Sequence, residues 1–460
     1  MRRDSRRRSA VLALSTAATL TLALALPAAA DPAVTHGGAA AGENPVVSWN
    51  AVAGRAAVAA CIAPLDDPLH ESRMYAITQV AVHDALNAID RRSRPYAYTA
   101  RADRHASVPA AVAAAAHDSL VATIAALPFP QQCRDAGLAT VEAAYADALA
   151  GIPDGRSKSR GLAVGQSAAA AIVRLRAGDG ADTPLVDPAF PQGTEPGEYR
   201  FTPGTPFVFL PGWGDLTPFT LRSAAQFQVG TPPALTSTRY ARDVNEVQRL
   251  GGDGVTTPSA RTAEQTQIAL YWWGSLPLLW NRIGRDVATR RGLDPWASAR
   301  LFGLVNLAMA DSYVASFDLK YRELFWRPVT AIQEADLDGN PRTHADPTWT
   351  PLRTTPPIPE YDSAHAVVGA AAAAAVRRFV GTDRVSFSAC SDTLPPGQTC
   401  SDAHPVVRHF GRLSDAAEEN GDSRVYIGFH FRTSARRGIA HGSAIGDHVV
   451  ERFLTPVRAR

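Results

Sequence analysis

Apolar residues recur at helical spacing along most of this chain. Between Ser72 and Asp90 they repeat every three or four positions, with polar residues between them, which is the pattern of an amphipathic helix. The repeating residues are Ile77, Val80, Ala81, Ala85, Leu86 and Ile89. Alanine-rich stretches at 108–126, 136–150 and 158–176 also favour helix. Because alternating runs bounded by turn residues are scarce, the pattern predicts an all-α protein.

One long stretch interrupts the helical pattern. Residues 182–236 are rich in proline, glycine and aromatic residues, as in "PGTPFVFLPGWGDLTPF", and helical texture returns from about Thr262 to Arg452. Irregular segments of this length are usually functional or linkers, and the aromatic residues indicate that this one packs on other parts of the protein. We expect three parts after the N-terminus. They are an N-terminal helical part (31–181), an irregular segment (182–260) and a C-terminal helical part with the site (261–460).

The first thirty residues have the features of a secretory signal peptide. A basic head precedes an apolar stretch from Val11 to Leu26, and Ala28 and Ala30 lie just before the expected cleavage point. The stretch "SRRRSAV" also resembles a twin-arginine export signal. We expect residues 1–30 to be removed and the mature protein to be secreted. No later stretch has the roughly 18 consecutive apolar residues of a membrane span, so no stable span is expected.

The charge of the chain argues against one class of partner. The formal net charge is +2, with 20% charged residues. Outside the signal, no basic run is interleaved with aromatic residues, as a nucleic-acid-binding surface would require. Nucleic acid is therefore not an expected partner.

Four cysteines in an exported chain favour disulfides over free thiols. Cys390 and Cys400 flank a turn-rich loop that can close a local bridge, which would leave Cys61 with Cys133; the other pairings stay open. The alternative is a zinc site that joins the second cysteine pair to two histidines. These histidines are His404 and His409. The two cysteines are farther apart than the usual spacing of about two to four residues.

The scarcity of lysine points to a first candidate site. The chain has 46 basic residues but only two lysines, Lys158 and Lys320. On a helix running into Pro328, Lys320 and Arg327 would lie two turns apart and project from one face. The residues between them include Leu324, Phe325 and Trp326. These apolar side chains indicate burial, where unpaired cations are unfavourable, so we interpret the two cations as binding an anion. The alternative is a solvated face on which Glu323 pairs with either cation.

A second segment offers a place for an anion. The stretch "PPIPEYDSAHAVVGAAAAAAVRRFVG" puts Asp362 or Ser363 at the N-cap of an alanine-rich helix opened by prolines. The first turn of such a helix presents free backbone N–H groups and a partial positive charge. Ser363, the Ala364 N–H and His365 could therefore bind an oxyanion. The alternative is a capped helix with an exposed histidine.

A third segment, "GDSRVYIGFHFRTSARRGIAHGSAIGDHVV", carries Arg424 and, after five intervening residues, His430. Arginine binds oxyanions bidentately, and histidine is the nitrogen nucleophile or metal ligand that works near neutral pH. The alternative is a hydrogen-bonded core histidine between Phe429 and Phe431.

Together the three segments resemble the superfamily of vanadium-dependent haloperoxidases and type-2 phosphatidic acid phosphatases. Its pattern is K-x6-R-P, then P-S-G-H, then S-R-x5-H-x3-D. The matching residues are Lys320, Arg327 and Pro328; Ser363 and His365; and Ser423, Arg424 and His430. Stretches such as "HDALNAIDRRSRPY" and "LRAGDG" resemble secreted bacterial haloperoxidase-like proteins, so the resemblance spans nearly the whole mature chain. It implies helical bundles with the anion site in the C-terminal half.

The resemblance also implies a role for each site residue. His430 would be the apical ligand of vanadium, or the nitrogen that attacks phosphorus. His365 would hydrogen-bond the apical oxygen or protonate a leaving group. The groups implied to hold the equatorial oxygens of vanadate or phosphate are Lys320, Arg327, Ser363, the Ala364 N–H and Arg424. The ammonium would meet an oxygen as a point charge, where a planar guanidinium needs a fork of acceptors.

Three positions depart from the family pattern. Ala364 replaces glycine and adds a methyl group near the bound anion, and Asp362 replaces proline and adds a negative charge. Ser434 replaces the aspartate one helical turn after His430. The carboxylate expected to orient the imidazole is therefore missing, and a backbone carbonyl could replace it.

The first function implied by the resemblance is that of a vanadate-dependent haloperoxidase, in which bound vanadate takes up hydrogen peroxide and a halide is oxidised. The second is an acid phosphatase that hydrolyses a phosphate ester through a phosphohistidine, without vanadate. The third is a non-catalytic anion- or partner-binding protein. The intact cations and histidines argue against the third.

Other polar and aromatic candidates fit structural roles better. His83–Asp84 and His117–Asp118 lie in helical patterns, and we expect them to be structural. Trp272, Trp273 and Trp280 are expected in the core, with the alternative that one of them lines the site.

Overall fold

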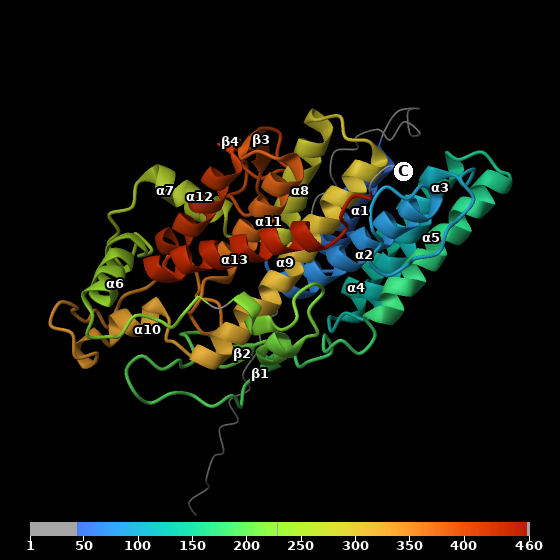
Figure 1. The fold of residues 1–460 in the computed structure, drawn as a ribbon. Coiled ribbons are helices and arrows are strands. Elements are labelled where there is room, and N and C mark those ends of the chain that lie inside the picture. Colours follow the sequence, from blue (N-terminus) through green and yellow to red (C-terminus); the bar gives the residue numbers. More distant parts are fainter. Residues whose placement is uncertain (1–43, 228, 458–460) are drawn as a thin grey trace, which may run out of the picture. The chain divides into compact units, whose positions relative to one another are not determined.

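The computed structural model describes residues 44–227 and 229–457, so the expected signal peptide (1–30) lies outside the described residues. Within them the chain is mainly helical, as predicted, with thirteen α-helices (Figure 1). The helices are α1 (Pro45–Ala59), α2 (Pro68–Ile89), α3 (Val108–Ala125), α4 (Gln131–Ala150), α5 (Arg156–Leu175), α6 (Thr238–Leu250), α7 (Ala263–Tyr271), α8 (Leu276–Arg290), α9 (Pro295–Glu323), α10 (Pro328–Gln333), α11 (Ala364–Val380), α12 (Leu413–Tyr426) and α13 (Arg432–Arg452). Two short antiparallel pairs join β1 (Val186–Asp187) to β2 (Val208–Phe209) and β3 (Arg384–Cys390) to β4 (Val407–Arg412).

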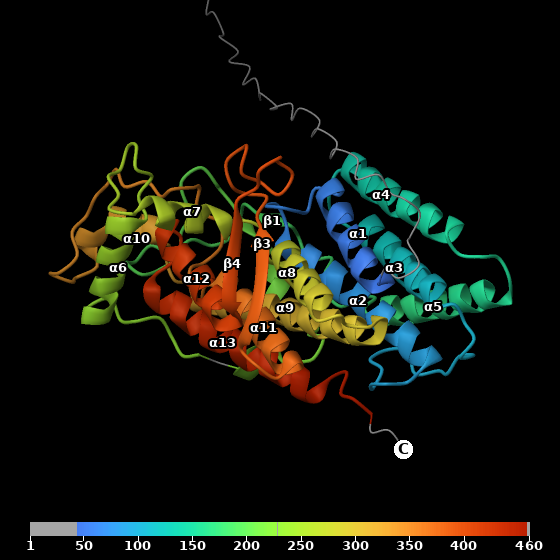
Figure 2. The same ribbon diagram turned by 90° about the horizontal axis from the view of Figure 1, so that it is seen from above.

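Helix α9 joins the N-terminal helices to the C-terminal ones. It packs against α2 on one side and against α11 and α13 on the other, and Figures 1 and 2 show it between the two groups. Most of its residues between Ser298 and Lys320 are buried, which is the pattern of a central helix. Its C-terminal turn therefore carries Lys320 into the interior.

Helices α11 and α13 approach closely because both carry small residues at their contact. Gly438, Gly442 and Gly446 repeat every four residues on α13, and a Cβ atom at any of them would collide with a backbone carbonyl oxygen of α11 or of its N-cap residue. The facing helix is rich in alanine. The two helices that border the site are thus held together by direct backbone packing.

The irregular segment supports the chain that follows α9. The Tyr199 N–H donates to the Leu324 carbonyl at 2.7 Å, and the Trp326 N–H donates to the Gly197 carbonyl at 2.9 Å. Tyr199 is buried, in line with the expectation that the aromatic residues of this segment pack on other parts. The segment therefore fixes the turn between the first two cations of the site.

Two elements differ from the sequence predictions. Helix α6 lies inside the stretch 182–260 that is expected to be irregular, because Ser237 caps it and Val244 and Val247 on its inner face are buried. The β3–β4 hairpin is not predicted, although the buried residues Val385, Phe387 and Ala389 alternate with more exposed ones.

The four cysteines form two disulfides, Cys61–Cys133 and Cys390–Cys400. The first links the end of α1 to the start of α4, and the second closes the loop between β3 and β4. Because Cys390 and Cys400 are bonded to each other, they are not free thiolates for a zinc ion.

By length and hydropathy alone, one described helix could cross a membrane. This is α3, of which 61% is buried inside the protein. The core helix of a compact protein passes the same test.

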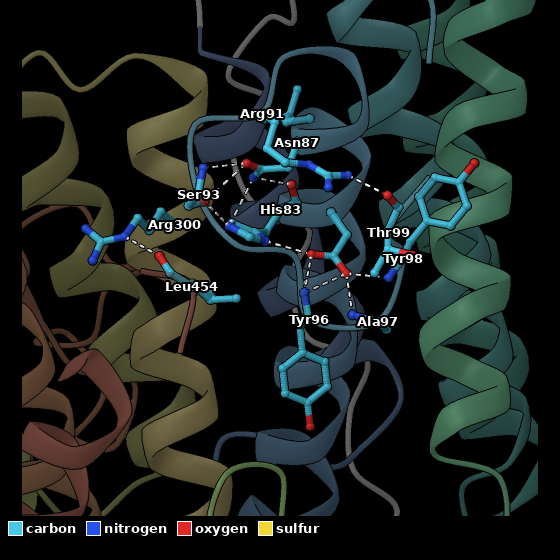
Figure 3. Close-up of polar contacts among 12 residues, drawn as sticks. His83, Asn87, Arg91, Ser93, Tyr96, Ala97, Tyr98, Thr99, Arg300 and Leu454 are labelled. Carbon is cyan, nitrogen blue, oxygen red and sulfur yellow. Dashed lines mark hydrogen bonds and ion pairs between the residues drawn. The ribbon is translucent and has the colours of Figure 1, made fainter. Parts of the chain in front are cut away.

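The His83–Asp84 pair anchors the loop that follows α2 (Figure 3). The Asp84 carboxylate accepts hydrogen bonds from the backbone N–H groups of residues 96–98 at 2.6–3.1 Å. His83 bonds to Asp84 through Nδ1 and to the Ser93 hydroxyl through Nε2. Since the polar side-chain atoms of the pair all have partners within the chain, its role is structural, as expected.

His117 and Asp118 also hold helices together. His117 bonds to Asp118 at 2.7 Å and to Glu142 at 3.1 Å, and its ring stacks on Tyr145. These contacts join α3 to α4.

A buried carboxyl group links the N-terminal helices to α8. Glu71 on α2 is fully buried and accepts a hydrogen bond from the hydroxyl of Ser275, the N-cap of α8. Burial raises the pKa of Glu71 to about 8. The group is therefore protonated in the folded protein at neutral pH.

Glu71→Gln should stabilise the protein above neutral pH. The raised pKa means that the stability contributed by Glu71 is fully present below the unfolded value of 4.5 and is lost as pH rises through about 8, because the unfolded chain ionises first. Glutamine stays neutral and keeps an oxygen for Ser275. The gain should be on the order of 2–4 kcal/mol at pH 8 and small at pH 4. Thermal unfolding at both pH values checks this, and an equal change in Tm at both would contradict it.

Candidate active site

The first motif forms a turn and not a continuous helix. Helix α9 ends at Glu323, Leu324 takes a left-handed conformation (φ 45°), and Arg327 is the N-cap of α10. The expectation of one helix running into Pro328 is therefore wrong, because Pro328 begins the next helix. Lys320 and Arg327 reach the site from the two sides of this turn.

Lys320 is fully buried, and its ammonium donates to three carbonyl oxygens. These belong to Pro359 (3.0 Å), Glu360 (2.9 Å) and Asp362. Three carbonyls around one point suit a compact ammonium with three donors and not a planar guanidinium, which explains a lysine in this arginine-rich chain. Burial, helped by the charge of Arg327, lowers the pKa of Lys320 to about 7. Lys320 thus fixes the backbone leading into α11, and its contact with an anion oxygen stays a prediction.

Both arginines are buried, and each has a nitrogen without a hydrogen-bond partner among the described residues. Arg327 donates from Nε to Ile358 O (2.6 Å) and from Nη1 to Phe429 O (2.9 Å), and its Nη2 has no partner. Arg424 on α12 donates from Nη1 to Trp272 O (2.8 Å), and its Nε has no partner. Burial lowers the pKa of Arg327 to about 10 and the pKa of Arg424 to about 9. Both remain cations at neutral pH.

His430 lies between an arginine and a carboxylate. Its Nε2 is 3.0 Å from Arg327 Nη1, and its Nδ1 is 3.0 Å from Glu360 Oε1. Arginine only donates, so these partners assign the proton to Nδ1 and the lone pair to Nε2. Burial lowers the pKa of His430 well below its usual value, and the charges of Arg327 and Lys320 lower it further. The imidazole is therefore neutral, with a basic nitrogen beside buried cations.

Glu360 supplies the carboxylate that the sequence lacks at position 434. It is fully buried and accepts hydrogen bonds from the Phe431 N–H (2.9 Å) and the Ser434 hydroxyl (2.6 Å), besides His430. The backbone carbonyl considered as a substitute is not used. Burial raises the pKa of Glu360 to about 7, although the Ser434 hydrogen bond and Lys320 oppose this. The motif analysis missed Glu360, and its signal was an acidic residue inside "PEYDSAH".

The negative charge at position 362 is paired within the protein. The Asp362 carboxylate accepts a hydrogen bond from the Ser316 hydroxyl (2.8 Å) and lies 2.9 Å from His441 Nδ1. Side chains of α9 and α13 thus bind the Asp362 carboxylate, which stands where the family pattern has proline. His441 is a second residue that the sequence analysis missed.

Ser363, and not Asp362, is the N-cap of α11. Its hydroxyl is fully buried, makes no capping hydrogen bond and has no partner among the described residues. Ala364, the first residue of the helix, is buried beside it. A buried hydroxyl at a helix N-terminus without a protein partner is what an oxyanion site would present.

His365 is the more accessible of the two site histidines. Its side chain is partly exposed, and its Nε2 is 3.3 Å from Gly274 O. Loss of hydration lowers the pKa of His365 well below its usual value, and the charge of Arg424 adds to this. The side chain is therefore neutral and able to accept a proton.

Comparisons with known proteins agree with this geometry. The family described as VCPO second helical-bundle domain matches residues 300–459, which contain all three motifs. Vanadium chloroperoxidase of Curvularia inaequalis is 28% identical over 52% of this chain and 52% of that protein. The match therefore spans about half the length of this curated relative.

Solved structures match over more of the chain. The structure described as the first bacterial vanadium-dependent iodoperoxidase has a TM-score of 0.73 and 25% identity, covering 90% of this chain and 97% of that one. The chain is therefore similar to vanadium haloperoxidases, and residues 300–459 match the helical-bundle family model. An apo-type bacterial vanadium-dependent chloroperoxidase shares the fold, with a TM-score of 0.67 and 18% identity, covering 85% of this chain and 95% of that one.

The donors of this vanadium haloperoxidase relative fit an oxyanion. Ser363 Oγ, Arg327 Nη2 and Arg424 Nε are buried polar atoms without partners among the described residues, and buried polar atoms normally have one. An anion with several oxygens would satisfy them and would offset two buried charges. Within residues 44–227 and 229–457, no group of three or more His, Cys, Asp or Glu side chains could hold a metal cation. Vanadate, bound as an oxyanion, fits this donor set.

One of the three tryptophans borders the site. Trp272 and Trp280 are buried in the core, whereas Trp273 is partly exposed and packs on the cluster that contains Phe429. Arg353 lies over the Trp273 ring, 5.1 Å from its centroid. Trp273 precedes Gly274, which contacts His365, so it lies beside the accessible histidine.

Proposed function

We propose that this protein is a vanadate-dependent haloperoxidase that oxidises a halide with hydrogen peroxide. The supporting observation is a neutral, buried His430 among buried donors that have no hydrogen-bond partner in the part of the chain that the structure describes. The reaction balances as halide, hydrogen peroxide and one proton giving hypohalous acid and water. Vanadate, when bound, supplies the activation of peroxide.

Different side chains would bind the anion and transfer protons. His430 offers the Nε2 lone pair, while the anion oxygens would be held by Arg327, Arg424, Ser363 and the Ala364 N–H. These donors act in a buried place where electrostatic interactions are strong. His365, neutral and partly exposed, accepts a proton from incoming peroxide and returns it to the departing oxygen.

The same geometry supports an acid phosphatase as the second candidate. A neutral imidazole held through Nδ1 by Glu360 is a nitrogen nucleophile for phosphorus. The donors that suit vanadate also suit a phosphoryl group. A non-catalytic anion-binding protein would use these donors without turnover.

One experiment separates the three functions. Purified protein, dialysed to remove anions, is titrated with orthovanadate and assayed for halogenation with peroxide and bromide or iodide, beside hydrolysis of p-nitrophenyl phosphate. We expect halogenation that rises with vanadate and saturates. Hydrolysis that vanadate only inhibits, without halogenation, would favour the phosphatase. Vanadate binding without either activity would favour the binding protein.

We also propose that the mature protein is secreted after removal of residues 1–30. The two disulfides support this, because such bonds persist in oxidising compartments. Recovery of the chain only inside the cell, with an uncleaved N-terminus, would contradict secretion.

A further inference from the structure

Glu360 connects the segment before α11 to the segment that leads into α13. Its Oε1 accepts hydrogen bonds from His430 Nδ1 (3.0 Å) and the Phe431 N–H (2.9 Å), and its Oε2 accepts one from the Ser434 hydroxyl (2.6 Å). The carboxylate is fully buried. All three partners of this one group lie within five consecutive positions of the chain.

These contacts decide which imidazole nitrogen carries the proton. On one side of His430, Arg327 Nη1 can only donate, and on the other side Glu360 Oε1 accepts. Both contacts are made only when Nδ1 is protonated and Nε2 is not. Without Glu360, no described side chain accepts a hydrogen bond from Nδ1, and the imidazole would be free to change tautomer or to rotate.

The Glu360 carboxylate is in direct contact with the side chain at position 434. The Ser434 hydroxyl lies 2.6 Å from Glu360 Oε2. An aspartate there would bring a second carboxylate against the first in a buried environment, where like charges repel strongly. A serine donates a hydrogen bond instead. A carboxylate at 434 and Glu360 therefore exclude each other.

We propose that Glu360 is the positioning residue of His430, holding the tautomer that offers Nε2 to an oxyanion, and that position 434 is a serine because Glu360 supplies the carboxylate. This rests on the proposed function only in that His430 binds the anion. It applies equally to vanadate and to phosphate.

A double-mutant cycle tests the proposal. The variants are Glu360→Ala, Ser434→Asp and the double variant, with Glu360→Leu as a variant that fills the space but has no hydrogen-bond acceptor. Nitrogen-15 NMR of histidine-labelled protein reads the His430 tautomer without any ligand, and calorimetric titration with orthovanadate or inorganic phosphate reads the affinity.

We expect the parent to show the Nδ1–H tautomer of His430. Both single variants at Glu360 should lose it and bind either anion about 10–100-fold more weakly. Ser434→Asp alone should also bind more weakly, because it crowds two carboxylates. The double variant should regain the tautomer and most of the affinity, since its one carboxylate then lies one helical turn after His430.

Glu246→Gln is the matched control. Glu246 pairs with Arg432 at the start of α13, at 2.8 Å, and makes no contact with His430. Its variant should keep the parental tautomer and affinity, which separates an effect on His430 from a general loosening of α13.

A parental tautomer in Glu360→Leu, or a double variant no better than Glu360→Ala, would overturn the proposal. If the alanine variants do not fold, or if the parent binds neither anion, the spectra of the parent and Glu360→Leu decide. If the double-mutant cycle gives the expected result but no halogenation occurs, the proposed haloperoxidase function is wrong. The positioning role of Glu360 is then still supported.

Discussion

His430→Ala should abolish tight binding of vanadate, whereas His365→Ala should keep binding and lose most turnover. Among the described groups bonded to Arg327, His430 alone carries a nitrogen lone pair, so no other group in contact with Arg327 replaces it. His365 contributes a hydrogen bond, worth about 1.5–3 kcal/mol to a charged group, and a proton transfer that typically contributes ~10²–10⁴-fold to rate. Its loss should weaken binding moderately and slow turnover strongly.

Calorimetric titration of both variants with vanadate, beside turnover measurements, checks these roles. His105→Ala is the control, because His105 is exposed on the loop before α3 and, among the described residues, its side chain bonds only to Asp103. It should match the parent in both measurements. The assignment is wrong if His430→Ala binds vanadate as tightly as the parent or if His365→Ala turns over normally.

Gly442→Ala should destabilise the protein by about 3 kcal/mol or more. A Cβ atom at this position would overlap the Val367 carbonyl of α11, and a backbone oxygen cannot rotate away as a side chain can. Helices α11 and α13 would have to separate. Because α13 carries Ser434 and α11 begins after Ser363, the separation should also weaken anion binding.

Gly411→Ala provides the matched control for this substitution. Gly411 is exposed in β4, and a Cβ atom there would meet no atom within 4 Å. Its effect on urea-induced unfolding should stay within about 0.5 kcal/mol. A Gly442→Ala protein that unfolds like the parent would show that the two helices are less tightly packed than the structure indicates.

The charges around the site explain how it can be buried and still favour an anion. Lys320, Arg327 and Arg424 are opposed by two carboxylates, Glu360 and Asp362, and all five side chains are buried. Buried ions are tolerated when they are paired and hydrogen-bonded. Asp362 is already bound by Ser316 and His441, so its charge is shared with groups other than the arginines. The remaining excess of positive charge favours an oxyanion.

The sequence by itself determined the helical class and the approximate ends of several helices, and it predicted the candidate site residues. The stretch 72–90 corresponds to α2 (Pro68–Ile89). The region from about 262 to 452, which has a helical sequence pattern, begins with α7 and ends with α13. These features are local, because helical periodicity and capping depend on residues a few positions apart. The cations and histidines of the three motifs were found for the same reason, since each motif is short.

Only the tertiary structure decided how these residues meet. The turn at Leu324 separates Lys320 from Arg327, and Lys320 binds three carbonyls about forty residues away. The carboxylate that bonds to His430 belongs to Glu360, 70 residues earlier in the chain. The histidine that bonds to Asp362 is His441, 79 residues later. Such pairs are set by the packing of α9, α11 and α13, which brings distant backbones within hydrogen-bonding range.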